Sequence, residues 1–188
     1  RASIENTNAL NMGNIRMLED RRWPSRARLY LVGADRTELN GWKILFDPKN
    51  AGLKEKWYLP SFDISKAMDI KTNTRARNEI VSLREKNFGK GSADTVWYYN
   101  RLDNIKVRDG GDMQLLFYSI DGNARVYLNG KLIFSRGIAG DRYFWKDPIL
   151  IDIPKGLMKP EGNLLAIRTD RGIGRSGIWQ PVNILYHK

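Results

Sequence analysis

The sequence predicts an all-β protein built as an antiparallel β-sandwich. Short runs of apolar, β-branched and aromatic residues follow one another from Thr95 to the C-terminus, separated by turn signals at intervals of roughly ten residues. Within this region, apolar and polar residues alternate across the segment Phe117–Phe134, on both sides of Asn129-Gly130. Because this dipeptide readily supplies the two positive φ angles of a type I′ turn, the segment is predicted to be a β-hairpin with one buried face.

The remaining strands are predicted from apolar runs bounded by Gly, Pro, Asn and Asp. They are expected at residues 28–33, 42–46, 95–105, 113–120, 148–153, 163–168 and 182–186. Turns are expected at residues 35–41 and at Asp121-Gly122-Asn123, and one short helical turn is expected at residues 53–58. The polar stretch 60–95 favours short helices or irregular surface structure.

Alternation also assigns side chains to faces, since successive residues of a strand point to opposite sides of the sheet. In the hairpin, Val126 and Leu128 are expected on one face of the first strand. In the second strand, Leu132 and Phe134 alternate with Lys131 and Ile133, so Leu132 and Phe134 are expected to share a face. Trp97 is expected in the core, because its large ring fits a pleated, buried surface.

The chain has 188 residues, of which 41% are hydrophobic, and this describes a folded domain with a substantial core. Residues 1–27 show no strong period and are expected to form an extended segment or linker ahead of a domain at residues 28–188. The chain begins with Arg, as a mature or trimmed protein would, and a removed signal peptide is compatible with this start.

Composition excludes several function classes. The chain has no Cys, so it has no disulfide, no thiolate metal site and no Cys nucleophile. It contains no apolar run of about 18 residues, so no membrane-spanning helix is expected. The net charge of +11 favours attraction to polyanions or simply a soluble surface rich in Lys and Arg. Nucleic-acid binding would rest on this charge alone, because no nucleic-acid-binding motif is present, and it is not expected.

Catalysis by this chain is not expected either. The single histidine, His187, lies one residue from the C-terminus, which leaves a Ser-His-Asp triad or a His-based metal site without a basis. No G-x-S-x-G sequence indicates a nucleophile elbow. Acidic residues are plentiful, but a glycosidase pair is defined by the spatial separation of its carboxylates, which the sequence does not give.

Four segments, in order, carry a family resemblance. They are VWYYNR at 96–101, SIDGNARVYLNGK at 119–131, GNLLAIR at 162–168 and SGIWQPV at 176–182. Together they resemble the sugar-binding domain of glycoside hydrolase family 2 and related polysaccharide-active enzymes. WKILF at 42–46 and KWY at 56–58 fall in the order that this family shows, so the resemblance extends over residues 42–186. It implies a jelly-roll sandwich of the galactose-binding-domain-like type, with roughly eight to ten strands.

This chain departs from the family pattern after the hairpin, where residues 137–145 read GIAGDRYFW and lack the His that the family places there. In that family the two catalytic carboxylates lie on a separate barrel domain, so the resemblance implies a non-catalytic module. The expectation is a carbohydrate-binding or accessory domain of a secreted, periplasmic or cell-surface polysaccharide-processing enzyme. The alternative is a structural module that orients a catalytic domain of the same or a partner chain without binding sugar.

Ligand contacts are expected in the loops that follow the hairpin and precede the last strand. Trp rings on such loops stack on the apolar faces of pyranose rings, while Arg and Asp bind sugar hydroxyls or clamp a carboxylate or sulfate. The candidates are Arg136, Arg142, Tyr143, Trp145, Asp170, Arg171, Arg175 and Trp179. Two alternatives stay open: Trp179 closes the end of the core, and the glycine-rich stretch 170–177 is a solvated connection.

A metal is a weaker expectation. Asp35, Asp47 and Asn50 offer hard oxygen ligands, and galactose-binding-like folds often hold a structural Ca²⁺. No EF-hand-like spacing supports this site, and no other cofactor is expected.

Overall fold

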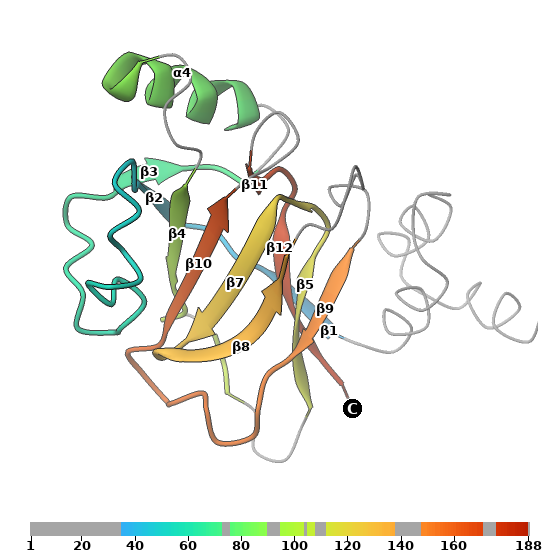
Figure 1. Ribbon diagram of the computed structural model, residues 1–188. Coiled ribbons are helices and arrows are strands. Elements are labelled where there is room, and N and C mark those ends of the chain that lie inside the picture. The colour runs from blue at the N-terminus through green and yellow to red at the C-terminus, as the bar shows by residue number, and fades with distance from the viewer. Residues whose placement is uncertain are drawn as a thin grey trace, which may run out of the picture.

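The computed structural model describes residues 35–72, 76–89, 95–103, 105–107, 112–137, 148–170 and 176–187. Within these residues it confirms the all-β class, because twelve strands form antiparallel sheets that pack as a sandwich, and the structure has one helix besides them (Figure 1). The predicted strand at 28–33 and the predicted linker at 1–27 lie outside the described residues. No helix in the described part of the chain is long and apolar enough to cross a membrane.

One layer of the sandwich is a six-stranded antiparallel sheet in the order β3-β2-β4-β10-β7-β8. Its strands are β2 (Trp42–Phe46), β3 (Met68–Ile70), β4 (Val96–Arg101), β7 (Asn123–Leu128), β8 (Lys131–Arg136) and β10 (Leu164–Asp170). The central strand β10 pairs with β4 on one side and with β7 on the other, so strands from three distant parts of the chain are neighbours.

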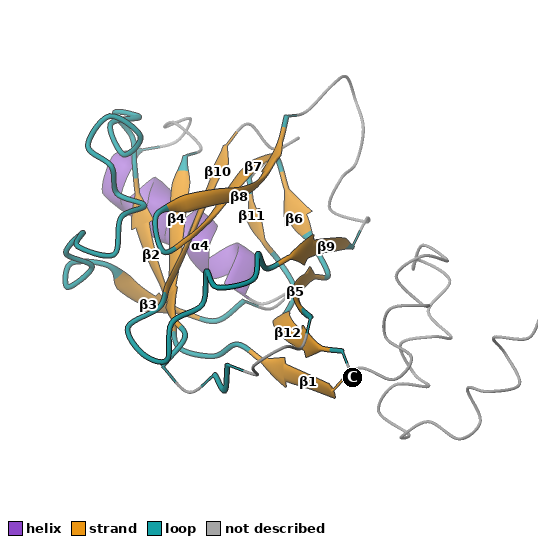
Figure 2. Ribbon diagram, turned by 90° about the horizontal axis from the view of Figure 1, so that it is seen from below, coloured by secondary structure: helices purple, strands orange, loops and turns teal. Residues whose placement is uncertain are grey.

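The other layer is a four-stranded sheet in the order β1-β12-β5-β9. It contains β1 (Asp35–Glu38), β5 (Met113–Phe117), β9 (Ile149–Asp152) and β12 (Val182–Tyr186). A short pair, β6 (Ile120–Asp121) with β11 (Gly177–Ile178), completes the strands. Figure 2 shows the strands of the two larger sheets in two rows.

The main hydrophobic core fills the space between these sheets. The six-stranded sheet contributes side chains such as Tyr98, Val126 and Ile167, and the four-stranded sheet contributes Phe117 and Ile184, all fully buried. The helix α4 (Ala76–Phe88) adds Ile80 to this core, and the Phe88 ring meets the Phe46 ring edge-on at 5.6 Å between centroids. In Figure 1 the helix lies at the β3 and β11 end of the sandwich.

A second hydrophobic cluster lies on the outer face of the six-stranded sheet, under residues 47–67, which we call the covering segment. Trp97, Tyr99 and Tyr127 from the sheet pack against aromatic side chains of the covering segment. The rings of Tyr58 and Tyr127 stack at 4.5 Å, and those of Phe62 and Tyr99 at 5.9 Å, measured between centroids. Strands β4 and β10 are therefore buried on both faces, which explains their nearly continuous apolar runs.

The predicted hairpin is present, with one difference in side-chain placement. Asn129 and Gly130 adopt φ values of 52° and 84°, as a type I′ turn requires. Val126 pairs with Phe134 but Tyr127 pairs with Leu132, so β8 carries one extra residue at this point, a β-bulge. The bulge turns Leu132 to the outer face, where it is 46% exposed, while Ile133 and Phe134 both contact the core.

In two other segments the secondary structure differs from the prediction or makes it more specific. Residues 35–38, expected to belong to a turn, form the edge strand β1, because their backbone pairs with β12 from Asp35↔Tyr186 to Glu38↔Asn183. Their side chains are all exposed, so no apolar pattern marks the strand. In the polar stretch 60–95, α4 confirms that a helix forms, and its mixed sequence carries no amphipathic pattern. Residues 68–70, expected as helix or irregular structure, instead form strand β3, because their backbone pairs with β2.

Candidate functional site

The structure brings two of the predicted ligand contacts to one end of the six-stranded sheet. Strand β8 ends at Arg136, which pairs with Ala124, and β10 ends at Asp170, which pairs with Asn123. Arg136 and Asp170 therefore flank the start of β7, and the chain continues from them into the two loops predicted to contact ligand. The predicted contacts Arg142, Tyr143, Trp145, Arg171 and Arg175 lie in those loops, outside the described residues.

The side chain of Arg136 is engaged with the backbone of the adjacent turn. Its Nη2 donates to the carbonyl oxygen of Ile120 at 2.8 Å and lies 3.4 Å from that of Gly122. A guanidinium held by carbonyl groups in this way fixes the path of the chain between β6 and β7. The geometry gives Arg136 a positioning role at the base of the loop that follows it.

Asp170 belongs to a buried polar network that ties three parts of the chain together. Its carboxylate accepts hydrogen bonds from Nη1 of Arg168 and from Nδ2 of Asn123, the second at 2.5 Å. Nη2 of Arg168 in turn donates to Oδ1 of Asn50, at the start of the covering segment, at 2.6 Å. Charge-assisted bonds of this kind are strong and directional, so the network fixes the end of β10 before the glycine-rich loop begins.

Trp179 is not presented to solvent in this structure. Its ring is 6% exposed and belongs to the main core, which is the alternative interpretation given above. Gly177 makes room for it, since a Cβ atom at that position would lie 2.7 Å from Cζ2 of Trp179 and 2.7 Å from the Tyr98 hydroxyl. The buried ring has no face available for stacking on a sugar, so its position does not support the expected ligand contact.

The three residues considered for calcium do not form a site. Asp35 lies on β1 in the four-stranded sheet, whereas Asp47 and Asn50 follow β2 in the other sheet. The Asp47 carboxylate accepts from the backbone N–H groups of Ala51 and Gly52 and from Nε1 of Trp97, at 2.7, 2.9 and 3.1 Å. Among the described residues, no three His, Cys, Asp or Glu side chains are grouped as metal ligands would be. Asp47 instead anchors the covering segment on the sheet.

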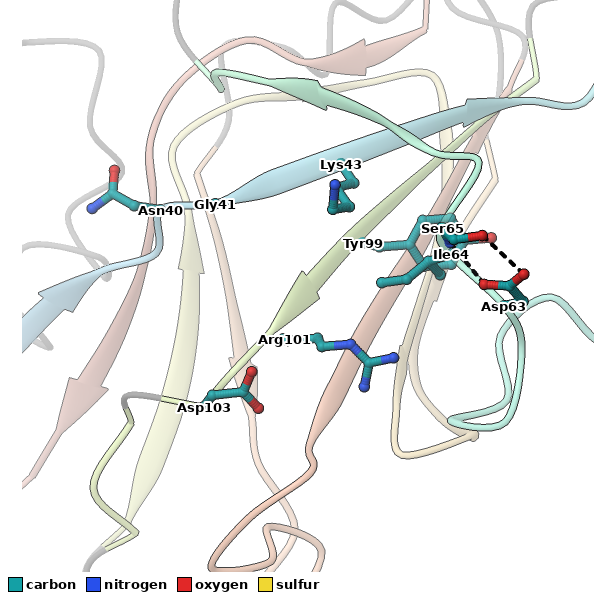
Figure 3. A pocket seen from close by; sticks show the side chains of 9 residues that line it. All are labelled: Asn40, Gly41, Lys43, Asp63, Ile64, Ser65, Tyr99, Arg101 and Asp103. Carbon is teal, nitrogen blue, oxygen red and sulfur yellow. Dashed lines mark hydrogen bonds between the residues drawn. The ribbon is translucent and has the colours of Figure 1, made fainter.

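A pocket that the sequence did not reveal opens beside the covering segment, and we call it the β2–β4 pocket. It has a volume of about 490 Å³. Its lining residues are Asn40, Gly41, Lys43, Asp63, Ile64, Ser65, Tyr99, Arg101 and Asp103. Figure 3 shows that they come from three places: the start of β2, the end of β4 and the Asp63–Ser65 turn.

Hydrogen bonds fix the walls of the pocket. The Asp63 carboxylate accepts from the backbone N–H and the hydroxyl of Ser65, both at 2.9 Å, and these bonds lower the pKa of Asp63 below its usual value. Nζ of Lys43 lies 2.8 Å from Oδ1 of Asp69, and Nδ2 of Asn100 donates to the carbonyl oxygen of Asn40 at 2.8 Å.

Tyr99 lies beneath the pocket and is fully buried. Burial raises the pKa of its hydroxyl well above the ordinary value, and the negative charge of Asp47 raises it further. The hydroxyl finds no hydrogen-bond partner among the described residues. Tyr99 is therefore neutral, and it is a structural wall of the pocket with one unused polar atom.

Sequence reasoning missed this pocket because its residues come together only through strand register. Alternation along β4 places Tyr99 and Arg101 on one face, and that much is visible in the sequence. The pairing of Lys43 with Tyr99 and the fold of the covering segment over β4 are long-range contacts, which no local pattern encodes.

Comparison with known proteins finds the same fold within larger enzymes. The apo structure of β-glucuronidase from Ruminococcus gnavus matches 82% of this chain with a TM-score of 0.61 and 19% sequence identity. Structures of that enzyme with uronic deoxynojirimycin and with D-glucuronic acid match equally well. The chain spans only about 29% of the length of these β-glucuronidase chains. No protein-family model and no curated protein matches the sequence. The likeness shows the fold.

Proposed function

We propose that this chain is a non-catalytic, carbohydrate-binding accessory domain of a larger glycoside hydrolase related to family 2, exported or displayed at the cell surface. The observation that carries the proposal is the fold likeness to a part of β-glucuronidase chains that amounts to about 29% of their length. The ordered motifs at 96–101, 119–131, 162–168 and 176–182 support the same relationship independently. An accessory role fits a sandwich whose central strands, β4 and β10, are buried on both faces.

The chemistry of the described residues is consistent with this role. The only histidine, His187, follows β12, where its Nε2 lies 2.7 Å from Oε1 of Gln114, and Gln114 also donates to Asp152 at 2.6 Å. This is a polar ladder across the four-stranded sheet, in which the histidine side chain bonds to a structural neighbour.

Glycan contact is proposed for the two loops that leave the sheet end. Arg142, Tyr143 and Trp145 lie in the first loop, and Arg171 and Arg175 lie in the second. Arg136 and Asp170 fix the points from which these loops start, as their hydrogen bonds indicate. Because the chain carries a net charge of +11, an acidic or sulfated glycan is the proposed ligand class for this site.

The test is a glycan-array screen of the purified chain at low and at physiological salt. Wild type is compared with Trp145→Ala and with a matched control, Trp57→Ala, whose half-buried ring belongs to the covering segment. We expect binding to uronate or sulfated glycans that weakens with salt and is lost in Trp145→Ala but retained in the control. Binding that Trp145→Ala leaves unchanged would contradict the loop site.

A second candidate function is that of a structural module which orients a neighbouring catalytic domain. The observation that favours it is that Arg136, Asp170 and Trp179, three of the predicted ligand contacts, are engaged in internal packing and hydrogen bonds. The absence of binding to every glycan on the array, for a chain shown to be folded by circular dichroism, would favour this function over the first.

A further inference from the structure

The β2–β4 pocket is distinct from the proposed loop site. At one end of β10, Leu164 pairs with Arg101, which lines the pocket, and the other end of β10 is Asp170. The strand rises about 3.3 Å per residue, so these two positions are roughly 20 Å apart. None of the eight predicted ligand contacts lines the pocket.

The polar groups around the pocket balance one another in charge. Lys43 and Arg101 are cationic, and Asp63 and Asp103 are anionic. Lys43 is also paired with Asp69, and Lys66 acts electrostatically on Asp63, so the surrounding charges remain balanced. Arg101 and Asp103 are both exposed, so their donors and acceptors face solvent. A dianion such as phosphate would meet two carboxylates here, and a metal cation would meet an ammonium and a guanidinium. The pocket therefore suits a ligand without net charge.

The same groups suit hydroxyls in particular. A hydroxyl group donates one hydrogen bond and accepts others, so it is satisfied best where donors and acceptors alternate. Arg101 and Lys43 supply donors, Asp103 and Asp63 supply acceptors, and Asn40 supplies both. A ligand with several neighbouring hydroxyls uses this arrangement fully, whereas a ligand with only donors or only acceptors does not.

The pocket is also preorganised and of a suitable size. Its volume of about 490 Å³ falls within the range of small-molecule sites, roughly 300–1,000 Å³. The Asp63–Ser65 hydrogen bonds fix one wall, and the bond from Asn100 to the Asn40 carbonyl fixes the opposite wall. The Tyr99 ring is held between Phe62 and Trp97, at centroid distances of 5.9 and 6.4 Å. The two walls and the Tyr99 ring are therefore in place before a ligand binds, and binding orders mainly the exposed side chains of Arg101 and Asp103.

We propose that the β2–β4 pocket is a second binding site, for one neutral, hydroxyl-rich sugar unit. The charge balance and the alternating donors and acceptors identify a polyol, and the choice of a sugar among polyols rests on the function proposed above. A domain with two such sites holds a glycan at two points, one that recognises acidic groups and one that recognises neutral residues.

The test is titration of the ¹⁵N-labelled full chain with methyl glycosides of D-glucose, D-galactose, D-mannose and D-xylose, followed by amide chemical shifts. D-glucuronate and glycerol serve as the charged and the small-polyol probes. We expect at least one neutral glycoside to shift the amides of Gly41 and the Asp63–Ser65 turn, with a millimolar Kd. Because the ligand is neutral, its Kd is expected to stay constant between low and physiological salt.

Two variants locate the site and a third controls for charge. Arg101→Ala and Asp103→Ala are each expected to weaken binding about tenfold or more, the effect of one lost hydrogen bond to a charged group. Arg36→Ala removes the same charge from exposed β1 in the other sheet and is expected to leave Kd unchanged. Trp145→Ala alters only the proposed loop site, so it is also expected to leave this Kd unchanged. The two variants therefore show whether the loop site or the pocket proposal is wrong.

Three outcomes would overturn the proposal. The first is the absence of any shift at Gly41 and the Asp63–Ser65 turn with tens of millimolar glycoside. The second is tighter binding of D-glucuronate than of every neutral glycoside, which would mean that a carboxylate is recognised instead. The third is equal weakening by Arg101→Ala and Arg36→Ala, which would show a general charge effect.

Discussion

Asp47 holds the covering segment on the sheet, and its replacement by Ala is expected to destabilise the whole domain. The side chain is 1% exposed and accepts three N–H donors, from Ala51, Gly52 and the Trp97 indole. Asp47→Ala removes all three acceptor contacts at once. Gly52 and the Trp97 ring are themselves buried, so their N–H groups would lose the acceptor without gaining water.

The magnitude follows from the number and type of these bonds. A hydrogen bond to a charged group contributes about 1.5–3 kcal/mol, and each buried donor left without a partner costs about 1–3 kcal/mol. The Ala51 N–H is only half-buried and water replaces its acceptor, so it adds little. Removing a buried carboxylate also recovers part of its desolvation cost, which lowers the sum. Asp47→Ala is therefore expected to reduce the free energy of unfolding by about 3–5 kcal/mol.

The assay is equilibrium unfolding in urea, supported by thermal melting. For a chain of this size 1 kcal/mol corresponds to roughly 2–4 °C, so Tm is expected to fall by roughly 10 °C. The matched control is Asp69→Ala, which removes an ion pair with Lys43 whose aspartate side chain is 86% exposed. Exposed pairs contribute at most about 1 kcal/mol, so the control is expected to change Tm little.

A double-mutant cycle with Trp97→Phe separates the indole bond from the backbone bonds. If Asp47 and Trp97 interact as their 3.1 Å contact indicates, the cycle gives a coupling of about 1–3 kcal/mol. The reasoning is refuted if Asp47→Ala and Asp69→Ala destabilise the protein equally, or if the coupling is zero. Equal destabilisation would mean that apolar packing alone holds the covering segment, and zero coupling would mean that the indole bond adds nothing to the two backbone bonds.

Three further predictions follow from single contacts. Tyr99→Phe removes a buried hydroxyl that has no partner among the described residues, so urea unfolding is expected to show unchanged or slightly higher stability; a loss above about 1 kcal/mol would contradict this. Asn129→Ala is expected to cost about 2–4 kcal/mol, because the Asn129 side chain bonds Leu157, Asn163 and Leu164 and its φ of 52° is unfavourable for Ala; a change in Tm below about 3 °C would be evidence against it. Ser65→Ala is expected to raise the lowered pKa of Asp63 towards 3.8, observed by NMR titration of its carboxyl carbon. In wild type, the stabilisation from this turn is present above the unfolded-state pKa and is lost as the pH falls through the lower folded-state pKa, and an unshifted titration in wild type would contradict the assignment.

Much of the fold was predictable because it is encoded locally. The hairpin turn is specified by Asn129-Gly130, whose positive φ values the structure shows. The strands at 42–46, 149–152 and 182–186 lie within or match the predicted apolar runs, since alternation of side chains is a property of the strand itself. Edge strand β1 was missed, because its exposed residues DRTE carry no apolar pattern and its backbone pairing with β12 is a long-range contact.

For the candidate site residues too, the local sequence predicted some positions, and long-range contacts decided the others. The sequence predicted Arg136 and Asp170 in loops just beyond two strands, whereas the structure makes them the last residues of β8 and β10. Antiparallel pairing on either side of β7 brings them to one end of the sheet. It left the position of Trp179 open between ligand contact and core. The ring is buried because Gly177, two residues earlier, leaves the space that it fills against Tyr98.

By itself, the sequence determined the all-β class, the central hairpin and the resemblance to a sugar-binding module, because turn residues and the two-residue period act over short stretches of chain. Only the tertiary structure decided the bulge that exposes Leu132, the folding of residues 47–67 over the outer face of the sheet, and the pocket that Lys43 and Arg101 share. These features depend on register between distant strands and on packing between large side chains, and such long-range contacts are formed only when the whole domain folds.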